Sequence, residues 1–321
     1  MTHYATNLEA IREAYERISH VVHRTPIQTS TQLDQVADTK IWFKCEHLQK
    51  VGAFKFRGAS NVVLGLSEQQ AAAGVVTHSS GNHAQALALA AKQRGIPAYI
   101  VMPSNAPQVK QDAVEGYGAT ITLCEPTLEA RESTANQVRE ETGATFIHPY
   151  DHPGIMAGQG TVALELLEQV PELDVIIAPV GGGGLLSGIA IAAKALKPTI
   201  RVVGAEPAGA DDAYQSKVNN EFVPQTSPNT IADGLLTSLG ELTWPVVRDL
   251  VDEIVVVNDA QIAYAMRLMM ERGKLLVEPS GAVSYAAAVK MRFEEPHPRV
   301  GCVISGGNIN LTRISELLDL A

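Results

Sequence analysis

Short hydrophobic runs alternate along this chain with longer stretches that have helical spacing. The runs lack the polar alternation of a half-exposed sheet, and helical stretches separate them, which is typical of parallel strands covered on both faces. Strands are predicted at 41–45, 75–78, 98–102, 120–124, 175–180, 201–205, 254–257 and 300–304. Helices are predicted at 84–94, 127–142, 158–168, 185–196 and 259–272. The fold class that follows is α/β.

The strand and helix units between about residues 75 and 150 are numerous enough to form a lobe of their own. We predict a large domain built from residues 1–73 and 152–321, with residues 74–151 inserted as a small domain. Each lobe is expected to hold a mostly parallel sheet flanked by helices. Composition does not mark the junctions between them.

Composition narrows the class of protein. The 321 residues include 25 Lys+Arg against 35 Asp+Glu, a net charge of −10, which disfavours nucleic acid and anionic membranes as partners. The richest apolar stretch, 185–196, is too short to span a bilayer, and the first residues do not resemble a signal peptide. Cys45, Cys124 and Cys302 are widely spaced, as in a reducing compartment. A cytoplasmic protein that binds a small molecule is expected.

Three polar, glycine-containing turns follow predicted strands. They are Ser79-Ser80-Gly81-Asn82-His83, Gly181-Gly182-Gly183-Gly184 and Ser305-Gly306-Gly307-Asn308. Ligands of open α/β sheets bind beyond the carboxyl ends of the strands. Three such turns in one chain therefore predict a single composite site.

The four consecutive glycines predict a phosphate site. Residues without Cβ let backbone N–H groups approach an anion at the start of a helix, where the dipole also favours negative charge. The run 181–184 does not match the dinucleotide, P-loop or nucleophile-elbow spacings. A turn that needs positive φ is the alternative interpretation, but it accounts for only one or two of the glycines.

Lys55 lies between Phe54 and Phe56 in a segment bounded by glycines. A desolvated amine has a lowered pKa and is nucleophilic. Taken alone, such a lysine is more often solvated on a helix. Together with a phosphate site, it predicts a Schiff-base lysine for pyridoxal phosphate.

These segments resemble the fold type II pyridoxal-phosphate family of serine/threonine dehydratases, serine racemases and threo-3-hydroxyaspartate dehydratases. The resemblance covers about residues 25–311 and is greatest to the racemases. It rests on 49–58, 79–83 and 181–184, with support from 124–126, 205–217 and 230–234. It implies an enzyme that interconverts L- and D-serine and also eliminates water from serine or threonine, giving a keto acid and ammonia.

The resemblance assigns a cofactor role to several positions. They are Phe54, Lys55, Asn82, Tyr150, Gly181, Gly182, Gly183, Gly184 and Ser305. Lys55 would hold the cofactor covalently, Asn82 would bind its phenolic oxygen and Ser305 its ring nitrogen. A hydroxyl cannot keep that nitrogen protonated, so the ring is a weaker electron sink, which suits elimination better than transamination.

Racemisation needs a proton carrier on each face of Cα. The resemblance assigns Lys55 to one face and Ser80 to the other, and a positioned acid or base contributes about 10²–10⁴-fold. Ser80 is equally compatible with a helix N-cap. The substrate set that the resemblance implies is Ser79, Ser80, Asn82, His83, Arg131 and Ser238. Arg131 is otherwise a solvated residue of helix 127–142.

A metal and a nucleotide are also implied by the resemblance. Glu206, the Ala210 carbonyl and Asp212 match divalent-cation ligands, and oxygen ligands suit Mg²⁺ or Ca²⁺, with Mn²⁺ as a further option. ATP would activate a homodimer by binding at its interface. The matching positions are Ser30, Thr31, Lys50, Gln85, Tyr117 and Asn308, although Gln32 and Val51 differ from the pattern.

The segment from Tyr150 to Pro153 departs from the mammalian racemases and resembles fungal racemases and hydroxyaspartate dehydratases. A cationic His152 could accept a β-carboxylate there. His148 and His152 are not expected to share a zinc ion, because Pro149 opposes the helix needed. The alternatives are a threo-3-hydroxyaspartate dehydratase, a catabolic threonine dehydratase and a non-catalytic amino-acid sensor that binds pyridoxal phosphate.

Overall fold

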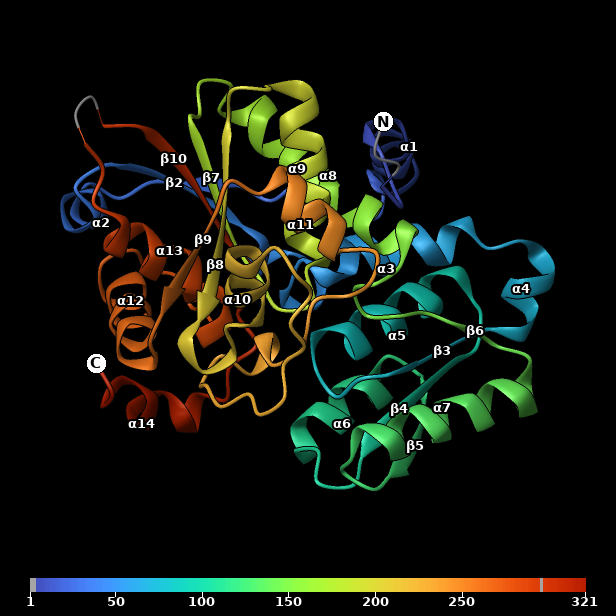
Figure 1. The fold of residues 1–321 in the computed structure, drawn as a ribbon. Coiled ribbons are helices and arrows are strands. Elements are labelled where there is room, and N and C mark those ends of the chain that lie inside the picture. Colours follow the sequence, from blue (N-terminus) through green and yellow to red (C-terminus); the bar gives the residue numbers. More distant parts are fainter. Residues whose placement is uncertain (1–3, 295–296) are drawn as a thin grey trace.

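The computed structural model describes residues 4–294 and 297–321. It contains two sheets, drawn in Figure 1. The larger has the order β1 (Ile27–Gln28), β2 (Lys40–Cys45), β10 (Arg299–Ile304), β7 (Val175–Pro179), β8 (Arg201–Pro207) and β9 (Glu253–Val257). The smaller has the order β5 (Thr120–Cys124), β4 (Ala98–Pro103), β3 (Val75–His78) and β6 (Thr145–Phe146). Among the paired strands of the described residues, only β1 and β2 run antiparallel, so the mostly parallel α/β fold is confirmed.

Both faces of the large sheet are covered, which explains the continuous hydrophobic strands. In β7, Val175 and Ile177 face one core, and Ile176 and Ala178 face the other. The first core includes α2 (Thr31–Ala37), α12 (Asp259–Glu271), α13 (Pro279–Met291) and α14 (Ile314–Leu318). The second includes α1 (Leu8–Ile18), α8 (Pro153–Gln169), α9 (Gly184–Leu196), α10 (Asp212–Asn219) and α11 (Trp244–Leu250).

The small sheet is covered in the same way. One face packs against α5 (Asn82–Arg94) and α6 (Gln108–Gly116), and the other packs against α7 (Leu128–Thr142). The first of these cores also takes Phe56, Ala59 and Val63 from α3 (Lys55–Gly65), which precedes α4 (Glu68–Ala73). All four strands of the small sheet lie between residues 75 and 146. The small-sheet core thus extends to residues before 74, and the domain boundaries given above remain a prediction.

One helix begins before its predicted range, because the residues that cap its N-terminus do not belong to the hydrophobic pattern. The helix predicted at 158–168 begins at Pro153, because proline is favoured in the first turn and the His152 ring accepts the amides of Gly154 and Ile155. Short 3₁₀ segments complete the chain: η1 (Glu46–Leu48), η2 (Lys50–Gly52), η3 (Ala208–Ala210), η4 (Asp233–Leu235) and η5 (Leu311–Arg313). Across the described ranges, no helix is long and apolar enough to cross a membrane.

Candidate active site

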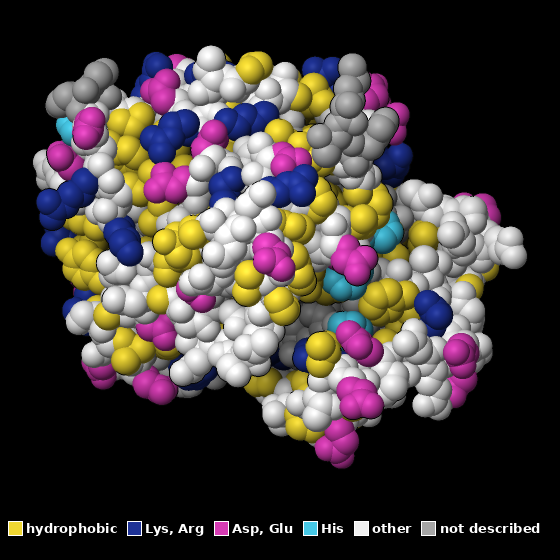
Figure 2. Space-filling model, in the orientation of Figure 1, with side chains coloured by type: hydrophobic (Ala, Val, Ile, Leu, Met, Phe, Trp, Pro, Cys, Tyr) yellow, Lys and Arg dark blue, Asp and Glu magenta, His cyan; other side chains and the backbone are white. Residues whose placement is uncertain are grey.

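The three polar turns come together where the two lobes meet. The Asn308 amide donates to Asn82 Oδ1 at 2.9 Å, which links the turn after β10 to the turn after β3. The ring of Tyr150 lies against Gly182, and the Lys55 amine is 6.0 Å from the centre of that ring. Figure 2 shows a hollow between the lobes, with histidine side chains at its edge. The composite site predicted from the turns is therefore present in the fold.

Lys55 is the first residue of α3 and points into this junction. Its Nζ donates to the Pro149 carbonyl at 2.8 Å and lies 5.3 Å from the centre of the Phe54 ring. Burial lowers the pKa of the amine to about 8. Because its pKa is lowered, more of this amine is uncharged near neutral pH than of an ordinary lysine, and that form can attack a carbonyl carbon.

The glycine loop presents unpaired backbone donors. Within the described residues, the amides from Gly181 to Leu186 have no hydrogen-bond acceptor, although the loop is buried. The first helical bond of α9 is donated by Ser187 to the Gly183 carbonyl. Buried N–H groups without partners are rare, and at a helix N-terminus they favour an anion. This loop fits the phosphate of the predicted cofactor.

Tertiary packing explains why glycine is needed in the loop. A Cβ at Gly182 would lie 2.3 Å from Cγ of Tyr150, and one at Gly184 would lie 3.0 Å from its Cβ. A Cβ at Gly181 would lie 2.9 Å from Cα of Leu235. Gly183 alone has positive φ, at +87°. The positive-φ interpretation therefore applies to one glycine, and contacts with distant residues explain the other three.

The turn after β3 offers a second set of free donors. The amides of Ser80, Asn82, His83 and Ala84 have no acceptor among the described residues, and they surround the N-terminus of α5. The N-cap of α5 is Gly81, and no side chain caps the helix. The N-cap interpretation of Ser80 is therefore wrong. In the described chain the Ser80 hydroxyl has no hydrogen-bond partner and is half-buried.

Glu278 joins two of the turns and was missed by the sequence analysis. Its carboxylate accepts from the Asn82 amide at 2.9 Å and from the Asn308 backbone N–H at 3.1 Å. Burial, and next the charge of Asp233, raise its pKa to about 8. Ser305 lies nearby: its hydroxyl donates to the Ser280 carbonyl, and its own carbonyl accepts from the Phe54 N–H. A single glutamate before a helix carries no local signal of this role.

The other predicted substrate residues, His83, Arg131 and Ser238, have hydrogen-bond partners in different segments of the chain. His83 is buried, with Nε2 at 3.3 Å from the Ile147 carbonyl, and burial holds its pKa well below the usual value. Arg131 is half-buried and donates to the Thr127 carbonyl of its own helix. It is close enough to His78 to help burial lower the pKa of that imidazole. Ser238 accepts from the Gln225 N–H at 2.8 Å.

The expectation of a cationic His152 is wrong. Its Nδ1 accepts two amides of α8, and protonation there would replace both hydrogen bonds with repulsion. Burial also lowers its pKa. His148 uses Nδ1 in the same way, accepting from Asp151 N–H at 2.8 Å, and burial lowers its pKa to about 4. In both imidazoles Nδ1 is therefore used as a hydrogen-bond acceptor.

Glu206 and Asp212 form a buried pair of carboxylates. Glu206 accepts the amides of Ala213 and Tyr214, and Asp212 Oδ2 accepts the amide of Leu239. Asp212 Oδ1 has no partner in the described structure. Burial and the neighbouring Asp212 raise the pKa of Glu206 to about 9. An orphaned oxygen beside a second carboxylate would suit a divalent cation held with the Ala210 carbonyl. Among the described residues, here or elsewhere, no group of three or more His, Cys, Asp or Glu is placed to hold a metal ion.

The predicted nucleotide positions are not assembled within one chain. Lys50 lies over the Phe56 ring at 5.7 Å, and Asn308 donates to the Val51 carbonyl. Ser30 and Thr31, however, lie at the start of α2, on the opposite side of the molecule from Tyr117 at the end of α6 (Figure 1). Gln85 is half-buried on α5.

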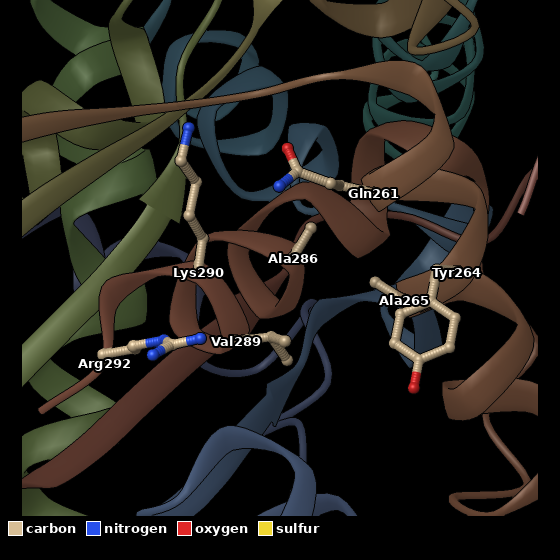
Figure 3. A pocket seen from close by; sticks show the side chains of 7 residues that line it. All are labelled: Gln261, Tyr264, Ala265, Ala286, Val289, Lys290 and Arg292. Atoms are coloured by element: carbon tan, nitrogen blue, oxygen red, sulfur yellow. The ribbon is translucent and has the colours of Figure 1, made fainter.

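A separate pocket of about 260 Å³ lies between α12 and α13. Figure 3 shows its side chains: Gln261, Tyr264, Ala265, Ala286, Val289, Lys290 and Arg292. The Tyr264 hydroxyl and the Lys290 amine point in different directions (Figure 3), and Lys290 donates to the Val256 carbonyl. No residue of the candidate site lines this pocket.

Comparison with known proteins defines the class. The model of the family described as pyridoxal-phosphate dependent enzymes matches residues 18–306. This chain therefore belongs to that family of enzymes.

The relatives narrow the resemblance further. A serine racemase of Oryza sativa subsp. indica is 53% identical over 98% of this chain and 94% of its own length. The structure of maize serine racemase matches with a TM-score of 0.95 at 52% identity, covering 98% of this chain and 97% of that chain. A beta-hydroxyaspartate dehydratase of Paracoccus denitrificans (strain Pd 1222) is 47% identical over 97% of this chain and 99% of its own length.

Proposed function

We propose that this chain interconverts L- and D-serine with pyridoxal phosphate and also eliminates water from serine and threonine. One observation supports this most: the Lys55 amine, whose pKa is lowered by burial, and the Ser80 hydroxyl belong to one junction, and among the described residues they have no hydrogen-bond partner beyond the Pro149 carbonyl. The similarity to serine racemases over nearly the whole chain supports the same reaction.

The residues around Lys55 would hold the cofactor. The amides of 181–186 would bind its phosphate, Asn82 its phenolic oxygen and Ser305 its ring nitrogen, while Phe54 and Tyr150 enclose the ring. When bound, the cofactor makes the Cα proton of an amino acid acidic by withdrawing electrons. The free amides of the Ser79–His83 turn would hold the substrate carboxylate at the N-terminus of α5.

The two proton carriers would then act on opposite faces of Cα. The Lys55 amine would remove the proton on one face, and the Ser80 hydroxyl would deliver a proton on the other. Elimination needs no proton on the opposite face of Cα, because the β-hydroxyl would leave as water with the proton that Lys55 removed. Ser305, a neutral partner, would limit carbanion accumulation in both reactions.

Substitution of Ser80 tests this assignment. Ser80→Ala is expected to lower racemisation by about 10²–10⁴-fold and to keep part of the elimination. Lys55→Ala is expected to abolish both. Chiral chromatography of L-serine incubations would measure D-serine, and a coupled assay would measure keto acid. Undiminished racemisation in Ser80→Ala would refute the two-carrier account.

A second reaction has one supporting observation. Arg131 is the cation that the structure brings near His78, and it could pair with a β-carboxylate, as in hydroxyaspartate. Rapid oxaloacetate production from L-threo-3-hydroxyaspartate, with negligible D-serine from L-serine, would favour that dehydratase. Arg131→Ala would then lose the activity, whereas His152→Asn would lose little, because His152 is neutral.

Several partners remain part of the proposal. Mg²⁺ or Ca²⁺ would bind Glu206, the Ala210 carbonyl and Asp212. ATP would bind between two copies of the chain, because its expected ligands in α2 and α6 lie far apart in one copy. A homodimer is proposed on this ground. The three free thiols suit a cytoplasmic location.

A further inference from the structure

Four buried ionisable side chains, two cations and two carboxylates, are joined around Arg57, which follows Lys55 by two residues. They are Lys44 of β2, Glu46 of η1, Arg57 of α3 and Glu165 of α8, and we refer to them as the ion quartet. Their side chains are at most 1% exposed. Two cations balance two carboxylates, so the quartet is neutral as a unit.

Arg57 is the centre of the quartet. Its guanidinium donates from Nε and Nη2 to both oxygens of Glu46, each at 2.8 Å. It donates from Nη1 and Nη2 to both oxygens of Glu165, also at 2.8 Å. Further bonds reach the Thr161 hydroxyl and the His23 carbonyl. This planar, doubly bidentate geometry is available to arginine and not to lysine.

The first turn of α3 is held to the large lobe in other ways too. The Phe54 N–H donates to the Ser305 carbonyl, and the Gly58 N–H donates to the Gln159 side chain. A Cβ at Gly158 would lie 2.5 Å from Cα of Gly58, so the two helices approach very closely. By contrast, Phe56 is buried in the core of the small sheet.

Stability alone does not explain a charged cluster at this position. Desolvating buried ions costs several kcal/mol per ion, and well-packed apolar residues often give equal or greater stability. What an apolar cluster does not supply is directional contact. Doubly bidentate bonds fix the rotation and height of α3, and Lys55 is two residues from the guanidinium.

We propose that Arg57 and Glu46 are a positioning pair for Lys55, holding its amine against the Pro149 carbonyl and beside the glycine loop. This rests on the proposed function, since it takes Lys55 as the amine that binds the cofactor. Glu165 and Lys44 complete the charge balance from the far side of the guanidinium.

Two double variants distinguish an effect on the position of the Lys55 amine from an effect of lost charge in the ion quartet. Arg57→Met with Glu46→Gln removes the proposed pair and leaves Lys44 with Glu165. Lys44→Met with Glu165→Gln is the matched control, because it also removes one cation and one carboxylate and leaves Arg57 with Glu46. In both variants, glutamine keeps an acceptor oxygen for the remaining hydrogen bonds. The charge stays balanced because each variant loses one cation and one carboxylate.

The readout is borohydride trapping of pyridoxal phosphate on Lys55. The amine condenses with the aldehyde and loses water, and borohydride reduces the product to a secondary amine that mass spectrometry locates. We expect the Arg57/Glu46 variant to need at least 10-fold more pyridoxal phosphate for half-maximal trapping than the control variant at equal urea midpoint. We also expect its pH midpoint for trapping to rise above about 8, because a loosened amine is better hydrated.

Equal trapping and equal pH midpoints in the two double variants would overturn the positioning role. If the Arg57/Glu46 variant does not fold, Arg57→Lys keeps the charge and loses the fork geometry. It should shift the pH midpoint in the same direction and weaken trapping at least 3-fold, and an unchanged Arg57→Lys would also overturn the role. Failure of the wild type to trap on Lys55 would instead remove the proposed function, and with it this role.

Discussion

The large lobe contains two buried clusters of ionisable groups that are built in opposite ways. In the ion quartet the charges pair with one another. Burial alone would raise the pKa of Glu165, but the neighbouring Arg57 and Lys44 hold that pKa below its usual value. The pair Glu206 and Asp212 has two carboxylates and no cation. Burial raises both of their pKa values, to about 9 and about 6.

This difference separates a buried cluster whose charges are paired within the chain from one whose charges are not. Buried charges are paired or coordinate metals, because an isolated buried ion is too costly. The quartet obeys this rule within the chain, so it has a structural or positioning role. The carboxylate pair breaks the rule, and Asp212 Oδ1 has no partner in the described residues. The divalent cation proposed above would relieve this imbalance.

The largest effect should come from breaking the quartet with a single substitution. Arg57→Met leaves Lys44 facing Glu46 and Glu165, and one buried negative charge has no partner. The free energy of unfolding is expected to fall by about 3–5 kcal/mol, measured by urea denaturation. Adding Glu46→Gln should restore at least half of the loss, because it restores neutrality. A loss below about 1 kcal/mol in the single variant would contradict the comparison.

Local sequence signals found the turns but not the quartet. The strands predicted at 75–78 and 120–124 coincide with β3 and β5, and the serine and glycine turn after β3 follows from a short-range pattern. Glu165 is 121 residues from Lys44, and no periodicity links them. Helix α3 was not predicted either, because it includes two glycines and is buried on almost every side.

The second effect concerns the incomplete cluster. Mg²⁺ or Ca²⁺ at about 100 times its dissociation constant should stabilise the wild type by about 2.7 kcal/mol, measured as a shift in thermal midpoint. The double variant Glu206→Gln with Asp212→Asn should lose this response. Glu168→Gln, at an exposed carboxylate, should keep it. A response that survives in the double variant would place the cation elsewhere.

The same pair should respond to neutralisation with the opposite sign from the quartet. In cation-free buffer, Asp212→Asn removes a buried carboxylate that helps raise the pKa of Glu206, and it keeps an oxygen for the Leu239 amide. The free energy of unfolding should therefore rise, by on the order of 1 kcal/mol. Glu165→Gln, which unbalances the quartet, should lower it under the same conditions. Destabilisation by both variants would show that the pair is not repulsive without a cation.

In the site, as in the fold, contacts between residues far apart in sequence could not be predicted. Gly181–Gly184 was recognisable because four glycines in sequence are unusual. The reason for Gly182 lies in the Tyr150 ring, and Glu278 bonds Asn82 across 196 residues. The charge state of His152 also depended on a helix that begins earlier than predicted. These features depend on contacts that a linear pattern does not contain.

Lys55 offers the most specific test, because it is a half-buried amine whose only hydrogen bond among the described residues goes to the neutral Pro149 carbonyl. Its pKa is lowered by burial from 10.5 to about 8. Between these values the unfolded chain binds a proton that the folded protein has lost, so the stability of the cofactor-free protein should rise with pH from about 8 to about 10.5. Below this window both states carry the proton, and Lys55 contributes no slope. The contribution is obtained by subtracting the urea midpoints of Lys55→Met, measured across the same pH range, from those of the wild type. A flat difference would mean that the amine is as hydrated as in the unfolded chain, and Lys55 would then lack the uncharged form that its proposed chemistry requires.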